Sequence, residues 1–188
     1  MTTLTLTGDD EADALLSDNG FALLVGMLLD QQIAMELAFV GPRRLAQRLD
    51  GELTPATVAA QDPEELEALF RQKPALHRYP GSMSRRVQAL AAHLVEHHDG
   101  RAEAVWEDVA EGRALRRRLE ALPGFGRQKA RIFLALLGKQ CGVRPEGWRE
   151  AAGEYGEPGH RSIADVTSPA SLEQVREFKR ARKAAAKG

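Results

Sequence analysis

Residues 122–130 read Leu-Pro-Gly-Phe-Gly-Arg-Gln-Lys-Ala, and they lie between two segments whose apolar residues recur at helical spacing. The first segment covers residues 113–121 and the second covers residues 127–137. Proline stops a helix, while Gly124 and Gly126 allow positive φ angles and leave the backbone without a Cβ. This stretch therefore predicts two helices joined by a five-residue turn.

Such a turn leads into the N-terminus of the second helix, where backbone N–H groups lack partners and the helix dipole is positive. This geometry favours a bound anion. One interpretation is a grip on DNA phosphates that ignores base sequence, with a monovalent cation bridging carbonyls of the turn. The alternative is an ordinary turn, because proline and glycine occur between many helices. Residues 113–131 favour the first interpretation, since they carry one acid, Glu120, against seven bases: Arg113, Arg116, Arg117, Arg118, Arg127, Lys129 and Arg131.

The rest of the chain also has a helical pattern. Alanine, leucine, arginine and glutamate dominate, and alternation of apolar and polar residues occurs only over residues 3–7. The 188 residues are 43% hydrophobic and 28% charged, which excludes wholesale disorder. We therefore predict an all-α protein. Caps, prolines and apolar periodicity predict further helices near residues 10–17, 21–29 and 33–49, and helices that begin at residues 55, 63, 84 and 169. Residues 70–83 and 142–169 are typical of loops, apart from a short helix near Trp148.

The net charge of −1 argues, by itself, against a polyanion as partner. The charges are unevenly distributed, however. Residues 1–20 and 50–67 carry acids and no bases, whereas bases dominate residues 113–131 and 176–187. Because distant charges are screened beyond about 8–10 Å, a polyanion responds to the nearer ones. The alternative is that these runs are solvated helix faces.

Cysteine, histidine and apolar patterns exclude several other classes of protein. The single cysteine, Cys141, cannot form an internal disulfide framework, hold an iron–sulfur cluster or complete a Cys₄ zinc site. The histidines do not form a metal-binding pattern, and no apolar run reaches the roughly 18 residues that span a bilayer. We therefore expect no metal site and no membrane contact.

Three segments together resemble one protein family. Residues 122–130 resemble the helix-hairpin-helix of the base-excision DNA glycosylases, the HhH-GPD superfamily. Residues 28–33, Leu-Leu-Asp-Gln-Gln-Ile, resemble the segment that opens the helical barrel of that family, in a form closest to the 3-methyladenine and endonuclease III-type glycosylases. Residues 82–94 are similar to the helix that precedes the hairpin. The resemblance covers about residues 20–150.

The resemblance implies the helical DNA-glycosylase fold, in which two helical lobes flank a cleft, without an iron–sulfur cluster. Residues 1–188 would form a single unit. Its helical core would cover residues 20–150 and include the hairpin over residues 113–137. The helices at the two ends of the chain, within residues 1–19 and 151–188, would pack together as the second lobe.

A glycosylase must rotate a damaged nucleotide out of the base stack. By the resemblance, Gln32 enters the duplex in its place, while Gln31 lies toward the base pocket. The alternative is a pair of glutamines that hydrogen-bond between helices. The resemblance also implies DNA contacts at Gly124, Phe125, Gly126, Arg127, Gln128 and Lys129, and stacking of the base on Trp148 and Tyr155, whereas Trp106 is more typical of a core residue.

Two positions depart from the family pattern. Members that also cut the DNA backbone have a lysine six residues after the hairpin leucine, where this chain has Gln128, and Lys129 lies about 100° further around the helix. We therefore predict base release by water without strand cleavage, and a phosphate contact or solvated charge for Lys129. The catalytic aspartate of the family corresponds by count to Glu146, for which a surface position in a helix's first turn is the alternative. Asp165 is the reserve candidate.

These features predict a DNA glycosylase of base excision repair that hydrolyses the N-glycosidic bond of a damaged, alkylated base flipped from double-stranded DNA. A non-catalytic protein that binds damaged DNA is the alternative, because the usual aspartate is missing, and a helical scaffold for another protein is a third hypothesis. Residues 77–81 fit DNA contact and simple loop structure equally well. We expect a cytoplasmic, nucleoid-associated monomer without a cofactor, apart from the cation at the hairpin.

Overall fold

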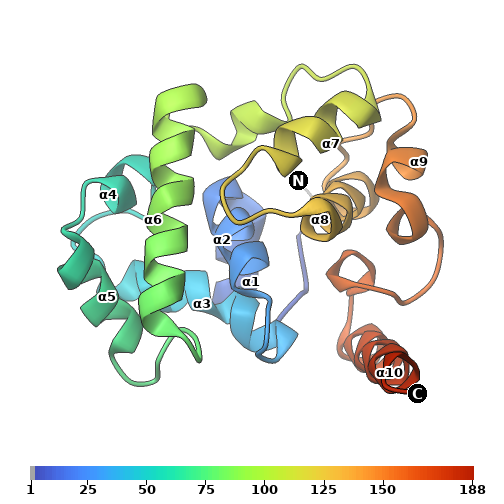
Figure 1. The fold of residues 1–188 in the computed structure, drawn as a ribbon, viewed down its shortest axis with the longest axis horizontal. Coiled ribbons are helices and arrows are strands. Elements are labelled where there is room, and N and C mark those ends of the chain that lie inside the picture. Colours follow the sequence, from blue (N-terminus) through green and yellow to red (C-terminus); the bar gives the residue numbers. More distant parts are fainter. Residues whose placement is uncertain (1–2) are drawn as a thin grey trace.

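The computed structural model describes residues 3–188, which form helices joined by loops and contain no strand (Figure 1). The predicted all-α class is confirmed. The α-helices are α1 (Asp10–Asp18), α2 (Gly20–Leu29), α3 (Met35–Arg48), α4 (Pro55–Ala59), α5 (Pro63–Arg71), α6 (Pro80–His97), α7 (Gly112–Glu120), α8 (Arg127–Gln140), α9 (Trp148–Ala152) and α10 (Pro169–Ala186), and the 3₁₀ helices are η1 (Ala102–Val105), η2 (Gly153–Gly156) and η3 (Ile163–Asp165).

Side-chain caps fix where several helices begin. The side chains of Asp9, Thr54, Asp62 and Ser168 each accept a hydrogen bond from a backbone N–H of the helix that follows. The sequence predicts a helix from Ser84, but α6 begins four residues earlier, at Pro80. A proline suits the first position of a helix, because its missing N–H has no acceptor there, so this proline starts a helix where a break was predicted.

Helix α2 lies at the centre of the molecule, and residues 21–29 are all buried. It packs against α3 and α6 on one side and against α8 on the other (Figure 1). Helices α4, α5 and α6 form one group, and α7, α8 and α9 form a second. The apolar run over residues 21–29 therefore forms a buried helix, as predicted, because it contacts both groups and leaves no face for solvent.

The two ends of the chain meet the rest in different places. Helix α1 packs on α2 and α3, whereas α10 packs on η3. Residues 5–8 line a small cavity together with Val166 and Leu172, so the N-terminal segment reaches the region where α10 begins. The division into a core over residues 20–150 and a second lobe from both ends stays a prediction.

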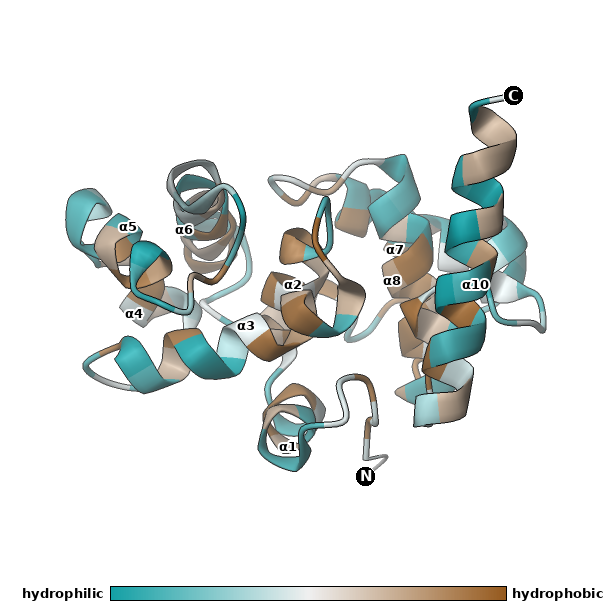
Figure 2. Cartoon of the chain, turned by 90° about the horizontal axis from the view of Figure 1, so that it is seen from below, coloured by the Kyte–Doolittle hydropathy of each residue, from teal (hydrophilic) through white to brown (hydrophobic). Residues whose placement is uncertain are grey.

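Helix α10 is buried only near its start. Ser171 and Val175 are buried, Leu172 and Phe178 are half-buried, and residues 179–188 are exposed. Figure 2 shows this helix at the edge of the molecule, with its C-terminal end extending away from the other helices. Its second half is therefore held mainly by charged side chains.

Over residues 3–188, no single helix is long and apolar enough to cross a membrane. Helices α1 and α2 reach the required length and composition only as a pair, which is bent by 116° at the break between them.

Candidate nucleic-acid interface

The predicted hairpin between α7 and α8 is present, and its two glycines have different roles. Gly124 has a φ of +81°, and the carbonyl of Leu122 accepts a hydrogen bond from the N–H of Phe125 at 3.0 Å, which closes the turn. A Cβ on Gly124 would overlap Cδ1 of Leu28. Gly126 has a φ of −84°, which any residue can adopt, and a Cβ there would point into open space.

The N-terminus of α8 presents unpaired backbone donors. In the part of the chain that the structure describes, the N–H groups of residues 126–129 have no acceptor, and that of Ala130 is the first to bond, to the carbonyl of Gly126 at 3.0 Å. Gly126, Arg127 and Gln128 are exposed. Because Gly126 carries no side chain, a group approaching these amides meets bare backbone, and the helix dipole favours an anion there.

Two hairpin residues predicted to contact DNA have side chains that are turned into the protein. Phe125 is buried and packs edge-to-face against Phe133, with ring centroids 6.1 Å apart, so its side chain anchors the hairpin in the core. Lys129 also turns inward: its Nζ donates to the carbonyl oxygens of Met27 at 2.6 Å and of Asp30 at 3.0 Å, and burial lowers its pKa to about 8. The Lys129 side chain therefore caps the C-terminus of α2, and its amine supplies neither the predicted phosphate contact nor the predicted solvated charge.

The loop between α2 and α3 presents Gln32 to solvent. Gln32 is exposed and has a φ of +58°, a conformation that costs free energy for a residue with a side chain. Its side chain makes no hydrogen bond within residues 3–188, so the interhelical role is not seen for it. Gln31 is half-buried instead, and its Nε2 lies 3.6 Å from Sδ of Met83 on α6.

His77 ties a second loop to this one. Its Nδ1 accepts a hydrogen bond from the N–H of Tyr79 at 3.0 Å, so Nε2 carries the proton and donates to the carbonyl of Gln31 at 2.9 Å. Burial lowers the pKa of His77 below its usual range, in agreement with this neutral form. The neighbouring Arg78 is exposed and lines an open groove with Gln32 and with Lys183 of α10. The loop over residues 77–81 therefore shares a face with Gln32.

Gln128 and Tyr155 meet at a cavity. Nε2 of Gln128 donates to Oη of Tyr155 at 3.0 Å, and both residues line a cavity of about 290 Å³, close to the size of small-ligand pockets. Helix α10 supplies much of the opposite wall, through residues that include Phe178 and Lys183. Because Lys183 also lines the groove beside Gln32, the structure brings Gln32, Gln128 and Tyr155 to neighbouring hollows.

The other predicted stacking residue lies elsewhere. Trp148 is buried, and its ring packs so closely on Gly138 of α8 that a Cβ there would overlap it. Arg149 lies over the same ring, 4.4 Å from its centroid. Trp148 therefore packs in the core, which does not fit the predicted place in a base pocket. Trp106 packs on Phe133, as expected for a core residue.

Glu146 does not join the cavity. Its side chain is exposed, while its backbone pairs with the start of α7: its N–H donates to the carbonyl of Ala110 at 2.9 Å, and its carbonyl accepts from the N–H of Gly112 at 2.7 Å. The cavity that Gln128 and Tyr155 line does not include it. This arrangement matches the surface alternative for Glu146 more closely than the catalytic one.

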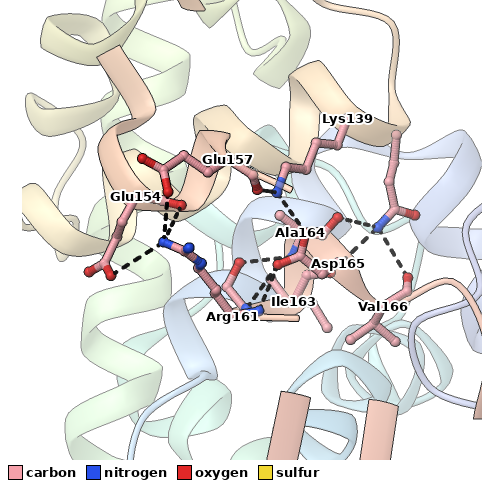
Figure 3. A network of polar contacts seen from close by, with 10 residues as sticks. Lys139, Glu154, Glu157, Arg161, Ile163, Ala164, Asp165 and Val166 are labelled. Carbon is pink, nitrogen blue, oxygen red and sulfur yellow. Dashed lines mark hydrogen bonds and ion pairs between the residues drawn. The ribbon is translucent and has the colours of Figure 1, made fainter. Parts of the chain in front are cut away.

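Asp165 is a structural carboxylate (Figure 3). Only 6% of its side chain is exposed; Oδ1 accepts from Nζ of Lys139 at 2.6 Å, and Oδ2 accepts from the backbone N–H of Arg161 at 2.8 Å. Gln140, next to Lys139, donates to the carbonyl of Ala164 at 2.8 Å. These contacts from the end of α8 fix η3, and with it the start of α10. These contacts give Asp165 a structural role, and its role as reserve catalytic residue stays a prediction.

Two carboxylates that sequence reasoning missed flank the glutamine loop. The Asp30 side chain is 9% exposed, and its Oδ2 lies 3.7 Å from Nζ of Lys179 on α10. Glu36 pairs with Arg176 on the same helix. The position of Asp30 beside Gln31 is visible in the sequence, but its partner lies 149 residues away, so the pairing has no local signal. No group of three or more His, Cys, Asp or Glu side chains in the described chain could hold a metal ion.

Comparisons with known proteins identify the family of the chain. The model of the family described as HhH-GPD superfamily base excision DNA repair protein matches residues 25–181. Two solved structures are similar. One is a trapped covalent endonuclease III–DNA intermediate (22% identity, TM-score 0.47, covering 91% of this chain and 79% of that chain), and the other is a non-covalent endonuclease III–DNA complex (21% identity, TM-score 0.46, covering 93% and 94%). No curated protein matches the chain. The chain belongs to the HhH-GPD superfamily of base excision DNA repair proteins.

Proposed function

We propose that this protein is a monofunctional DNA glycosylase, which extrudes a damaged base from double-stranded DNA and hydrolyses its N-glycosidic bond. One observation carries the proposal: an exposed glutamine in a strained loop, a bare helix N-terminus and a cavity of about 290 Å³ occupy adjoining parts of the molecule. Base extrusion needs a group that fills the gap, contacts that hold the DNA backbone and a pocket that receives the base. The glutamine, the helix N-terminus and the cavity would supply these in turn.

Different residues support the phosphate contact and the filling of the gap left by the extruded nucleotide. The free amides of residues 126–129 and the exposed guanidinium of Arg127 suit a phosphate, because both donate to an anion. Gln32 suits the gap left by the nucleotide, because its amide is flat, polar and exposed to solvent. Lys129 links the two, since it joins the first turn of α8 to the carbonyls just before Gln31.

Two residues of the hairpin, Gln128 and Lys129, support hydrolysis by water without strand cleavage. Gln128 occupies the position of the family's lysine, and an amide cannot form a Schiff base. Lys129 donates to three carbonyl oxygens, those of Met27, Leu28 and Asp30, so its amine has no free approach to a sugar. Lys179 and Lys183 do line the cavity, so reductive trapping is part of the test.

The test uses duplexes that each contain a single modified base. We expect the abasic site to be revealed only after alkali cleaves the strand, and borohydride to trap no covalent complex. Strand cleavage without alkali, together with a trapped complex, would contradict the monofunctional proposal. The matched control is Gln128→Lys, which restores the family's amine beside Tyr155 and is expected to bring both strand cleavage and trapping.

A non-catalytic protein that binds damaged DNA is the second candidate, and one observation favours it. Both oxygens of Asp165 are engaged by Lys139 and by backbone amides, and Glu146 does not line the cavity. Binding of damaged duplexes without release of any base would favour this candidate. Affinity that barely changes with salt would instead favour a scaffold for protein, because phosphate contacts predict a steep dependence.

Other expectations stay proposals at this stage. A cation at the hairpin stays a proposal; the Leu122 carbonyl, which accepts from Phe125, keeps a second lone pair for it. We propose a monomer in the cytoplasm, close to the nucleoid, because that location would give the protein access to DNA. The expectation of an alkylated base rests on the resemblance of residues 28–33 and on the weakened glycosidic bond of a cationic lesion. The charges around the cavity argue for a different class of base.

A further inference from the structure

We infer that the cavity beside Gln128 selects bases that leave as anions, namely carbonyl-rich oxidised or deaminated bases, over cationic alkylated purines. The inference rests on the proposed glycosylase function and names its substrate class. It replaces the alkylated base that the sequence predicts.

The cavity lining carries positive charge only. Its charged side chains are Arg161, Lys179, Arg182 and Lys183, and no carboxylate lines it. The remaining wall is apolar or amide in character, with Ile132, Tyr155, Phe178, Ala186 and Gln128. A base entering this space would therefore meet aromatic side chains and cations, and a charge on the base would interact with those cations at short range.

Carboxylates hold most of these cations from outside the cavity. Glu154 accepts from Arg182 at 2.7 Å, and Asp30 lies 3.7 Å from Nζ of Lys179. Arg161 pairs with Glu157 at 3.1 Å. Neither Glu154, Asp30 nor Glu157 lines the cavity, so these acids orient the cations without offering a negative group to the base. Lys183 makes no ion pair within residues 3–188, so its charge is the least compensated of the four.

The charge on the leaving base decides which substrates such a cavity favours. In hydrolysis the bond between C1′ and the base nitrogen breaks, and its electron pair goes to the base. The oxygen of water bonds to C1′, and the proton that water loses ends on the base or in solvent. A neutral carbonyl-rich base departs as an anion, which nearby cations stabilise, whereas an alkylated purine enters as a cation and departs neutral. The cavity therefore stabilises the first reaction and repels the second substrate.

Gln128 adds a preference for the same class. Its Nε2 donates one hydrogen to Tyr155, which leaves the second Nε2 hydrogen and the Oε1 acceptor. A neighbouring carbonyl and N–H on the edge of a base match that donor and acceptor pair. Bases of this kind include uracil, hydroxylated pyrimidines and 8-oxoguanine, and all of them can leave as anions.

The experiment measures single-turnover release with protein in saturating excess, so that differences in DNA affinity do not enter the rate. One set of duplexes carries uracil, 5-hydroxyuracil or 8-oxoguanine, and the other carries 7-methylguanine or 3-methyladenine. The rate of spontaneous base loss is first subtracted for each duplex. At least one carbonyl-rich base is then expected to be released about tenfold faster than either alkylated base.

Charge variants on α10 make the test specific. Lys183→Glu is expected to lower release of the carbonyl-rich base by about tenfold and to narrow the ratio between the two classes. The matched control is Lys187→Glu, on the same exposed helix but not in the cavity lining, which is expected to leave the ratio unchanged.

The outcomes separate the inference from the proposed function. Faster release of an alkylated base, or a ratio that Lys183→Glu leaves unchanged, would overturn the substrate class while the glycosylase function stands. No release from any duplex that the protein binds would overturn the glycosylase function, and the inference with it.

Discussion

The hairpin at the start of α8 and the wall that α10 contributes to the cavity are built in different ways. The hairpin uses backbone amides, two glycines and contacts with α2, so residues 122–130 contain nearly all of its information. The α10 wall uses side chains whose partners are distant, as in the pairs of Arg176 with Glu36 and Lys179 with Asp30. A site made of backbone amides can therefore be predicted from a short stretch of sequence. A site made of side chains cannot, because it depends on how a whole helix is placed.

The largest expected effect comes from the contact that places α10. Asp165→Ala leaves the half-buried Lys139 amine with the Glu157 carbonyl but without a carboxylate, and it removes the acceptor for the Arg161 N–H. We therefore expect the free energy of unfolding to fall by about 3–5 kcal/mol. Urea unfolding measures this change. The hairpin amides do not depend on Asp165. We therefore expect the free energy of DNA binding, measured per folded molecule, to change far less than the free energy of unfolding.

A second variant separates a structural role of Asp165 from a catalytic one. Asp165→Asn keeps the size of the side chain, and base release per folded molecule is expected to stay close to that of the wild type. A well-folded Asp165→Asn protein that has lost base release would restore Asp165 as a catalytic residue.

The next effect tests how the hairpin is joined to α2. The folded-state pKa of Lys129, about 8, lies below its ordinary 10.5, so between these pH values the unfolded chain holds a proton that the folded chain lacks. Raising the pH through this window therefore stabilises the folded state, by up to about 3 kcal/mol. Lys129→Met lacks this contribution, so the stability advantage of the wild type over the variant should grow from pH 8 to 10.5.

Urea titrations of both proteins at several pH values measure the difference directly. The control is Lys187→Met, an exposed lysine at the end of α10, which should give a curve parallel to the wild type. A parallel curve for Lys129→Met as well would mean that this amine is not buried against α2.

A smaller effect is expected inside the turn. Gly124→Ala places a Cβ where Cδ1 of Leu28 lies and forces a φ of +81° on a residue with a side chain. We expect the free energy of unfolding to fall by about 2 kcal/mol, measured by thermal or urea unfolding. An unchanged stability would show that the turn can relax, and would remove the reason for a glycine at this position.

Local signals predicted much of the fold and part of the site. Caps such as Asp9 and Ser168 act within one turn of their helix, so the sequence reveals them directly. The hairpin and its exposed Gly126 follow from the same logic. Pro80 was misread because a proline both ends and begins helices, and only the packing of α6 decides between them.

The inward and outward directions of side chains were harder to predict. Phe125 and Lys129 lie in the motif, but whether they face solvent depends on α2 and on Phe133, which the motif does not contain. Trp148 was misjudged for the same reason, since the space above Gly138 is visible only in the folded chain. Asp30 was overlooked because its partner on α10 is remote in sequence.

The most direct measurement of the central claim is the affinity of Gly126→Val for a DNA duplex, by fluorescence anisotropy at several salt concentrations. A Cβ at residue 126 meets no protein atom, and the methyl groups of valine would cover the free amides of α8, so stability should change by no more than about 1 kcal/mol. The account predicts an affinity at least about tenfold weaker than wild type, while Ala170→Val, exposed in the first turn of α10, binds normally. A folded Gly126→Val protein with wild-type affinity would contradict the claim that these amides hold the DNA backbone.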